Sequence, residues 1–175
     1  VVSRTKLLPK AAAPEVVFRR LCDMHPRALV YLMHHPVEGT WCGATPELLL
    51  RAQQRDVDTV SLAGTRRNGS QADWTPKEQQ EQQVVTDHIV DVLNAQGARD
   101  ITMSGPHDKQ YGDLVHLETK ISARVDGDLH RLAKALHPTP AVCGRPVDKA
   151  TAFIRTQEQH NRTYYAGFLL SLIHI

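Results

Sequence analysis

One stretch of alternating residues, from Asp113 to Val125, constrains the fold more than any other feature of the chain. Its odd positions are mostly apolar, and its even positions from His116 onward are all polar. The apolar set is Val115, Leu117, Ile121, Ala123 and Val125, and the polar set is His116, Glu118, Lys120, Ser122 and Arg124. Because successive side chains of a strand point to opposite faces, this pattern predicts a strand with one buried and one polar face. Such strands are typical of antiparallel sheets.

Helical spacing of apolar residues, together with helix-start signals, predicts four helices. The clearest begins at Thr75-Pro76-Lys77-Glu78, which has the form of a capping box with proline at the first helical position, and it ends at Gly97. The other three are predicted over about 14–25, 128–136 and 146–157, and prolines bound the first two of these at their C-terminal ends.

Short apolar runs bounded by glycine and proline predict further strands. These strands cover 28–33, 40–44, 47–51 and 59–63, one more starts at Tyr164, and residues 1–5 are also strand-like. Strands and helices are mixed without a regular βαβ repeat. We therefore expect an α+β fold, with largely antiparallel β-sheets and helices packed on the outside.

Composition excludes several classes of function. A length of 175 residues suits one domain or part of a larger one. The 21 basic and 19 acidic residues are well mixed, so the basic stripe expected of a nucleic-acid-binding protein is missing. No apolar run approaches the ~20 residues of a membrane span. The three cysteines have no CxxC spacing, which favours reduced thiols in a cytoplasmic protein.

The residues alone leave two interpretations of Glu81 open. It lies one turn before Val85 on the apolar side of its predicted helix, where a carboxylate is costly unless it is paired or binds a metal. The surrounding run of glutamate and glutamine equally suits a solvated face near the helix start, where the helix dipole favours a carboxylate. Segments 61–66 and 136–141 have the glycine and proline of tight turns, which are found both at anion sites and in ordinary loops.

Six sequence blocks follow one another over nearly the whole chain. They are Val1-Val2-Ser3-Arg4; residues 43–49, Gly-Ala-Thr-Pro-Glu-Leu-Leu; Leu62-Ala63-Gly64-Thr65; His116-Leu117; residues 136–141, Leu-His-Pro-Thr-Pro-Ala, with Gly144 and Pro146; and Glu158 with Arg162, Tyr165, Ala166 and Gly167. In this order and spacing, the chain resembles the isochorismate synthase branch of the chorismate-binding enzyme family. The resemblance implies that the fold is part of the chorismate-utilising enzyme fold.

Two stretches distinguish this branch from its aminating relatives. Anthranilate and aminodeoxychorismate synthases tend to carry Asp-Leu-x-Arg-Asn-Asp where this chain has residues 86–91, Thr-Asp-His-Ile-Val-Asp, and Pro-Ala-Gly-Thr where it has residues 137–140. Both differences favour water over ammonia as the nucleophile. A salicylate synthase, an aminating relative and a non-catalytic chorismate-binding module remain the alternatives.

The resemblance implies a Mg²⁺-dependent enzyme that converts chorismate to isochorismate by adding water and losing the 4-hydroxyl. It assigns Glu47 as the general acid and Glu81 as a magnesium ligand. The positions that it places at the substrate are Gly64, Thr65, His116, Thr139, Tyr165 and Gly167. Judged without the resemblance, Glu47 is an exposed strand-end residue and His116 is a solvent-facing strand residue. Gly64, Thr65 and Thr139 are then ordinary turn residues.

The resemblance also places a general-base lysine before residue 1, and an arginine and further magnesium ligands beyond Gly167. We therefore expect residues 1–169 to be a partial catalytic domain, truncated at both ends and inactive alone, and residues 170–175 to be a non-native tail. The complete protein is expected to be a cytoplasmic monomer whose partner is chorismate. Menaquinone, siderophore and salicylate synthesis all use its product, and the resemblance favours menaquinone.

Overall fold

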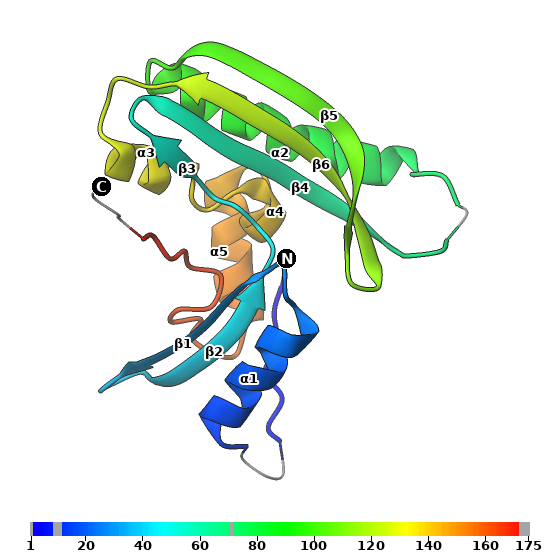
Figure 1. The fold of residues 1–175 in the computed structure, drawn as a ribbon, viewed down its shortest axis with the longest axis vertical. Coiled ribbons are helices and arrows are strands. Elements are labelled where there is room, and N and C mark those ends of the chain that lie inside the picture. The colour runs from blue at the N-terminus through cyan, green and yellow to red at the C-terminus, as the bar shows by residue number, and fades with distance from the viewer. Residues whose placement is uncertain (1, 9–11, 71, 172–175) are drawn as a thin grey trace. The chain divides into compact units, whose positions relative to one another are not determined.

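The computed structural model describes residues 2–8, 12–70 and 72–171, and the chain divides into two compact units (Figure 1). The smaller unit comprises residues 4–47, and the larger comprises residues 1–3 and 48–175.

The smaller unit is a helix followed by a two-stranded hairpin. Helix α1 (Pro14–Met24) has proline in its first turn, and Pro26 follows its end. Strands β1 (Leu29–His35) and β2 (Gly39–Thr45) pair antiparallel from Leu29↔Thr45 to His35↔Gly39. The predicted helix and both predicted strands of this unit are confirmed. The glycine at position 43 leaves room for the ring of Tyr31 on the paired strand, because a Cβ there would lie 2.7 Å from the Tyr31 hydroxyl.

The larger unit is built on a four-stranded antiparallel sheet with the order β3-β4-β6-β5 (Figure 1). Its strands are β3 (Arg51–Gln53), β4 (Asp56–Arg67), β5 (Arg99–Tyr111) and β6 (Leu114–Arg124). The predicted alternating strand is β6, which pairs with β4 on one side and β5 on the other. All five of its predicted inward residues, from Val115 to Val125, are buried, so the predicted register of faces is confirmed.

Helix α2 (Pro76–Ala95) packs along one face of this sheet (Figure 1). Its capping box is present, as predicted: the backbone amide and the hydroxyl of Thr75 both donate to the Glu78 carboxylate, at 2.8 Å each. Val85, Ile89 and Leu93 are at most 2% exposed, and they pack with Val57 and Ile121 of the sheet. Burial of each such side chain contributes about 1.5–3 kcal/mol to the hydrophobic core.

Three further helices follow β6 in the chain. Helix α3 (Leu129–Leu136) is capped by Asp128, whose carboxylate accepts from the His130 amide, and its Leu132 and Leu136 complete the core. Helices α4 (Pro140–Cys143) and α5 (Val147–Gln157) come next. The predictions of helices at 128–136 and 146–157 are confirmed, whereas α4 was not predicted.

Several strand predictions are wrong. The run 47–51 contributes only Arg51 to a strand, and β5 was not predicted, whereas the predicted strand at 59–63 is confirmed as part of the longer β4. Residues 2–5 and 164–171 form no strand, and residues 163–166 are turns in which Thr163 and Ala166 have φ of 44° and 62°. Val1 and residues 172–175 of the expected tail lie outside the described residues, while Leu170 and Ser171 have no regular structure.

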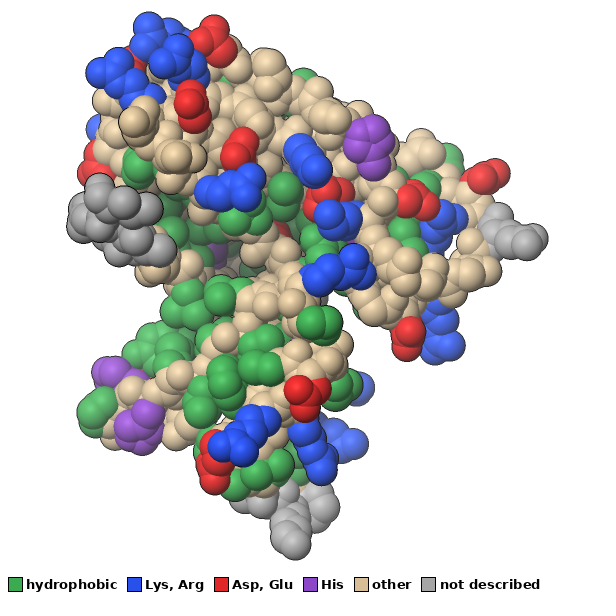
Figure 2. Space-filling view, viewed as in Figure 1, with side chains coloured by type: hydrophobic (Ala, Val, Ile, Leu, Met, Phe, Trp, Pro, Cys, Tyr) green, Lys and Arg blue, Asp and Glu red, His purple; other side chains and the backbone are tan. Residues whose placement is uncertain are grey.

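The surface mixes charges of both signs. Figure 2 shows lysine and arginine side chains interspersed with aspartate and glutamate on the face in view. Within residues 2–8, 12–70 and 72–171, no helix has the length and apolar character needed to cross a membrane.

Candidate functional site

A bulge in the central sheet brings Gly64, Thr65 and His116 together. The pairing of β4 with β6 runs regularly to Ala63↔Leu117 and resumes at Arg66↔Val115, so that residues 64 and 65 both face His116. This is a β-bulge, in which two residues of one strand oppose one residue of its neighbour. Gly64 adopts φ +72°, a left-handed conformation that glycine takes without steric cost. Three predicted substrate-binding residues therefore meet, although the resemblance gave no geometry for them.

The His116 ring is fixed by this bulge. Its Nδ1 lies 2.9 Å from the carbonyl oxygen of Gly64 and 3.1 Å from Oγ1 of Thr65. A carbonyl oxygen only accepts hydrogen bonds, so Nδ1 must carry the proton. In the neutral ring, Nε2 is then left as a hydrogen-bond acceptor. The bulge thus fixes the orientation of the imidazole and leaves Nε2 as its acceptor atom.

The residue after the bulge ties the site to the start of α2. The Arg66 guanidinium pairs with Asp108 of β5 and lies 4.6 Å from the centre of the Trp74 ring. The Trp74 indole N–H donates to the other oxygen of Asp108 at 2.7 Å. These hydrogen bonds hold the pKa of Asp108 below its usual range. Three segments that are distant in sequence are thereby fixed around Gly64.

Glu47, the predicted general acid, lies in the smaller unit directly after β2. The expectation that it begins a strand is wrong, since β3 starts only at Arg51. Its backbone amide donates to Oγ1 of Thr45 at 3.2 Å. The residue keeps an exposed surface, yet partial desolvation of its carboxyl raises the pKa of Glu47 above the usual value. A raised pKa favours the protonated form that a general acid requires.

Glu81, the predicted magnesium ligand, does not lie on the inward face of α2, and that part of the prediction is wrong. It is exposed and forms an ion pair with Lys77 at 3.0 Å, one helical turn earlier. Glu81 is thus on the solvated face, which was the other interpretation of its position. Among the described residues, no group of three or more histidine, cysteine, aspartate and glutamate side chains is arranged to hold a metal ion.

The inward position belongs to the next residue, Gln82, which is 2% exposed. Its side-chain amide donates to Ser61 of β4 at 2.9 Å and to Thr119 of β6 at 2.7 Å. Oγ1 of Thr86 joins the group, 2.6 Å from the Ser61 hydroxyl. This buried polar network fixes the rotation of α2 against the sheet, and hence the direction of Glu81. The burial of Gln82 was not predicted, because this residue lies in a run of glutamate and glutamine. Only its helical spacing to Val85 and Ile89 could have indicated it.

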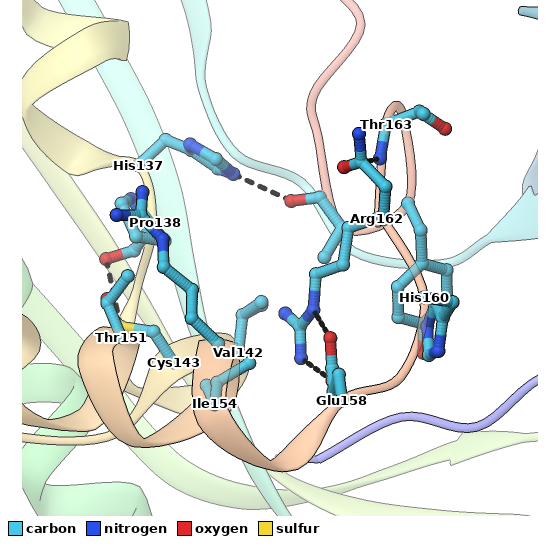
Figure 3. Close-up of a pocket in the computed structure, with 14 residues that line it drawn as sticks. His137, Pro138, Val142, Cys143, Thr151, Ile154, Glu158, His160, Arg162 and Thr163 are labelled. Atoms are coloured by element: carbon cyan, nitrogen blue, oxygen red, sulfur yellow. Dashed lines mark hydrogen bonds and ion pairs between the residues drawn. The ribbon is translucent and has the colours of Figure 1, made fainter.

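Of the remaining predicted residues, Tyr165 lines a second feature of the larger unit, whereas Thr139 and Gly167 are not part of its lining and only follow the lining residues Pro138 and Ala166 in sequence. A cavity of about 360 Å³ is lined by residues that include His137, Cys143, Ile154 and Tyr165 (Figure 3). Nε2 of His137 lies 2.7 Å from the Ala166 carbonyl oxygen, which connects α3 to the chain around Tyr165. Thr139 is buried, and its hydroxyl has no hydrogen-bond partner among the described residues.

An ion pair between Arg162 and Glu158 forms part of the lining of this cavity (Figure 3). Arg162 Nε donates to Glu158 at 2.7 Å, and the Glu158 side chain is only 3% exposed. The Ser3 amide and hydroxyl donate to the same carboxylate at 2.7 and 2.9 Å. Hydrogen bonds from Arg162, then from Ser3, hold the pKa of Glu158 far below its usual range. The pair anchors residues 158–162, which the sequence had marked only as part of a family block.

Comparisons with known proteins identify relatives of this chain. The chain is 33% identical over 152 residues to the isochorismate synthase MenF of Pasteurella multocida, covering 79% of this chain and 35% of that protein. It is 32% identical over 182 residues to the salicylate biosynthesis isochorismate synthase of Pseudomonas aeruginosa, covering 95% and 38%. The chain therefore spans well under half the length of either relative.

The fold is also that of a solved structure. The menaquinone-specific isochorismate synthase MenF of Escherichia coli superposes with a TM-score of 0.75 at 24% identity, over 85% of this chain and 37% of that one. The sequence model described as "Chorismate binding enzyme" matches residues 3–169, almost the whole chain. The chain belongs to the chorismate-binding enzyme family.

Proposed function

We propose that this protein is an isochorismate synthase, which converts chorismate to isochorismate with the help of Mg²⁺. The observation that carries the proposal is the bulge at residues 64 and 65, which sets Gly64 and Thr65 against His116 from 52 residues away in sequence. The resemblance places all three positions at the substrate, so they would have to lie together to contact one ring. The relatives in the comparisons, which are named as isochorismate synthases, support the choice of reaction within the family.

The reaction is an isomerisation in which one C–O bond forms and another breaks. Water adds to one ring carbon and loses a proton to a base, while the 4-hydroxyl departs and the ring double bonds shift. Hydroxide is a poor leaving group, so an acid must protonate it, and we assign this step to Glu47. The raised pKa of Glu47 supports the assignment. General acid catalysis of this kind contributes typically about 10²–10⁴-fold in rate.

The His116 imidazole is assigned to binding. Its Nε2 acceptor suits a substrate hydroxyl, and the Nδ1–Gly64 bond prevents the ring from turning away. The Thr65 hydroxyl beside it, on an exposed residue, can donate to a second oxygen of the ligand. Thr139, Tyr165 and Gly167 remain proposed substrate contacts, and the unpartnered buried hydroxyl of Thr139 is consistent with a role toward a ligand.

Glu81 suits a magnesium ion by its chemistry. Mg²⁺ binds hard oxygen ligands, keeps several waters, and in many enzymes uses one or two carboxylates together with an anionic substrate. The Lys77–Glu81 pair is exposed and of the kind worth only about 0–1 kcal/mol, so a cation can displace it. When bound, the ion neutralises charge on a substrate carboxylate.

The test is an isochorismate assay with chorismate and Mg²⁺ on two proteins: these 175 residues, and the full-length product of the source gene. We expect turnover by the full-length product and very little by the 175 residues alone, since the resemblance places the general base outside them. Failure of the full-length product to form isochorismate, under conditions where it is folded, would disprove the proposed reaction. Analysis of the products for salicylate and for aminated chorismates identifies the alternative activities.

A further inference from the structure

The sheet face opposite α2 carries a second polar group beside His116. Strands β5 and β6 pair Lys109 with His116 and His107 with Glu118. Directly paired residues project to the same face of a sheet, so Lys109, His116 and Glu118 lie on one face. The ring of Tyr111 connects them: its centre is 6.0 Å from the His116 ring and 5.9 Å from Nζ of Lys109. A cation thus lies next to the Gly64–Thr65–His116 group.

Glu118 holds this cation in place. Its side chain is 8% exposed, and Nζ of Lys109 is 3.7 Å from its Oε1. A buried carboxylate is costly without a compensating charge, so the pair restrains Lys109 near this position. At 3.7 Å the contact is electrostatic, since it is too long for a hydrogen bond. The Lys109 ammonium forms no hydrogen bond with any residue that the structure describes, and its side chain is 42% exposed. The ammonium is thus held near a proposed binding site with its donors available.

We propose that Lys109 binds a carboxylate of chorismate and that Glu118 is the positioning residue for its ammonium; this inference rests on the proposed function. Chorismate carries two carboxylates, and a charge-assisted hydrogen bond from an ammonium is about twice as strong as a neutral one. The ligand ring would then lie between an acceptor, Nε2 of His116, and a donor, Nζ of Lys109. An acceptor on one side and a cationic donor on the other favour a ligand that carries both a hydroxyl and a carboxylate over an uncharged ring.

The experiment compares four variants of the full-length gene product by steady-state kinetics with chorismate and Mg²⁺. Lys109→Met should raise KM by roughly 10- to 100-fold, as expected for loss of a hydrogen bond to a charged group, while kcat changes little. Lys109→Arg should restore most of the affinity. Glu118→Gln should raise KM less than Lys109→Met, again with kcat preserved. Lys120→Met is the matched control, because Lys120 is exposed two residues further along the same face of β6 and forms no ion pair among the described residues.

A fifth variant removes the ambiguity of misfolding. Lys109→Met alone leaves a buried carboxylate without its partner and can lower stability, whereas Lys109→Met/Glu118→Gln removes both charges. The double variant, checked for a wild-type circular dichroism spectrum, should keep the raised KM. A folded double variant with the KM of Lys120→Met overturns the role of Lys109, and leaves the isochorismate synthase assignment intact.

Equilibrium dialysis with chorismate separates this inference from the proposed function. If the wild-type protein makes no isochorismate but binds chorismate, and the double variant loses that binding, Lys109 is supported and the proposed reaction is wrong. A wild-type protein that neither binds nor converts chorismate overturns both.

Discussion

Nδ1 of His116 donates to the carbonyl oxygen of Gly64 across 2.9 Å, and the acceptor is the backbone of a glycine with φ +72°. The orientation of a ring on β6 therefore depends on the backbone conformation of β4. Any L-residue at position 64 resists this value of φ. A substitution there would therefore shift the backbone carbonyl and disturb the hydrogen bond that orients His116.

Gly64→Ala is expected to destabilise the protein by about 1–2 kcal/mol, the cost of a left-handed alanine, and to weaken chorismate binding. Gly69→Ala is the matched control, since Gly69 has φ +82° and nothing lies within 4 Å of its added methyl group. Urea unfolding should give similar losses for the two variants, and only Gly64→Ala should change KM. Equal KM values would show that the Gly64 carbonyl does not orient His116 for binding.

Gln82→Ala is expected to lower the free energy of unfolding by about 2–3 kcal/mol. The buried hydroxyls of Ser61 and Thr119 would lose their donor, and each unsatisfied buried group costs about 1–3 kcal/mol. The neighbouring Gln83→Ala should change stability by less than about 0.5 kcal/mol, because Gln83 is exposed. Denaturant unfolding measures both variants. A similar small effect at the two positions would contradict the network's role in fixing α2.

Glu47→Gln is expected to preserve the fold and chorismate affinity while reducing kcat by about 10²–10⁴-fold. In the wild-type protein the rate should fall as pH rises through the raised pKa of Glu47, since the acid must be protonated. The variant's residual rate should lack this fall. The control is Glu38→Gln in the exposed β1–β2 turn. Near-normal turnover of Glu47→Gln would remove Glu47 as the acid.

Glu81→Ala is expected to weaken the response of activity to Mg²⁺ and to raise KM for chorismate. Lys77→Ala breaks the same ion pair but keeps the carboxylate, so it should leave the Mg²⁺ titration unchanged. The measurement is activity against Mg²⁺ concentration for both variants and the wild-type protein. Should Glu81→Ala keep a normal magnesium response, the metal assignment is wrong.

The ion pair of Glu158 with Arg162 predicts that the stability of the protein depends on pH. The pKa of Glu158 is lower in the folded protein than its ordinary value of 4.5. The stabilisation from its ionised carboxylate is therefore fully present above pH 4.5 and is lost as the pH falls through the folded-state pKa. Glu158→Gln should therefore lower Tm at pH 7 and lower it less at pH 3. Glu15→Gln, on the exposed side of α1, should shift Tm little at either pH. A Tm difference for Glu158→Gln that stays constant with pH would contradict this linkage.

The sequence predicted elements whose local pattern matched their burial. Strand β6 alternates because one face lies on α2, and α2 itself has a capping box and an apolar stripe. Strand β5 was missed because nearly all of its residues are exposed or half-exposed, so no period-two pattern remains to be read. The strand expected from Tyr164 does not form, and Thr163 and Ala166 there have positive φ.

The resemblance predicted which residues belong to the site, and the structure shows how those residues are arranged in space. A bulge in β4 brings Gly64, Thr65 and His116 together. The alternation of polar and apolar residues in the sequence gives no indication of this bulge. The sequence left the side of α2 that Glu81 occupies open between two interpretations, and it made no separate assignment for Gln82, the neighbour that is buried. One residue along a helix turns a side chain by about 100°, so neighbours in a run of similar residues differ sharply in burial. The roles of Glu47, Glu81 and Thr139 stay predictions.

The bulge in β4 gives this strand one residue more than its ladder with β6 requires. Ala63 and Arg66 are paired with Leu117 and Val115 and would stay paired if the chain between them were one residue shorter. Position 65, which is exposed, can therefore vary in chemistry without altering the strand pairing on either side, whereas position 64 keeps its glycine because of its left-handed φ. Selection for a new ligand could act on position 65 while the scaffold remains the same.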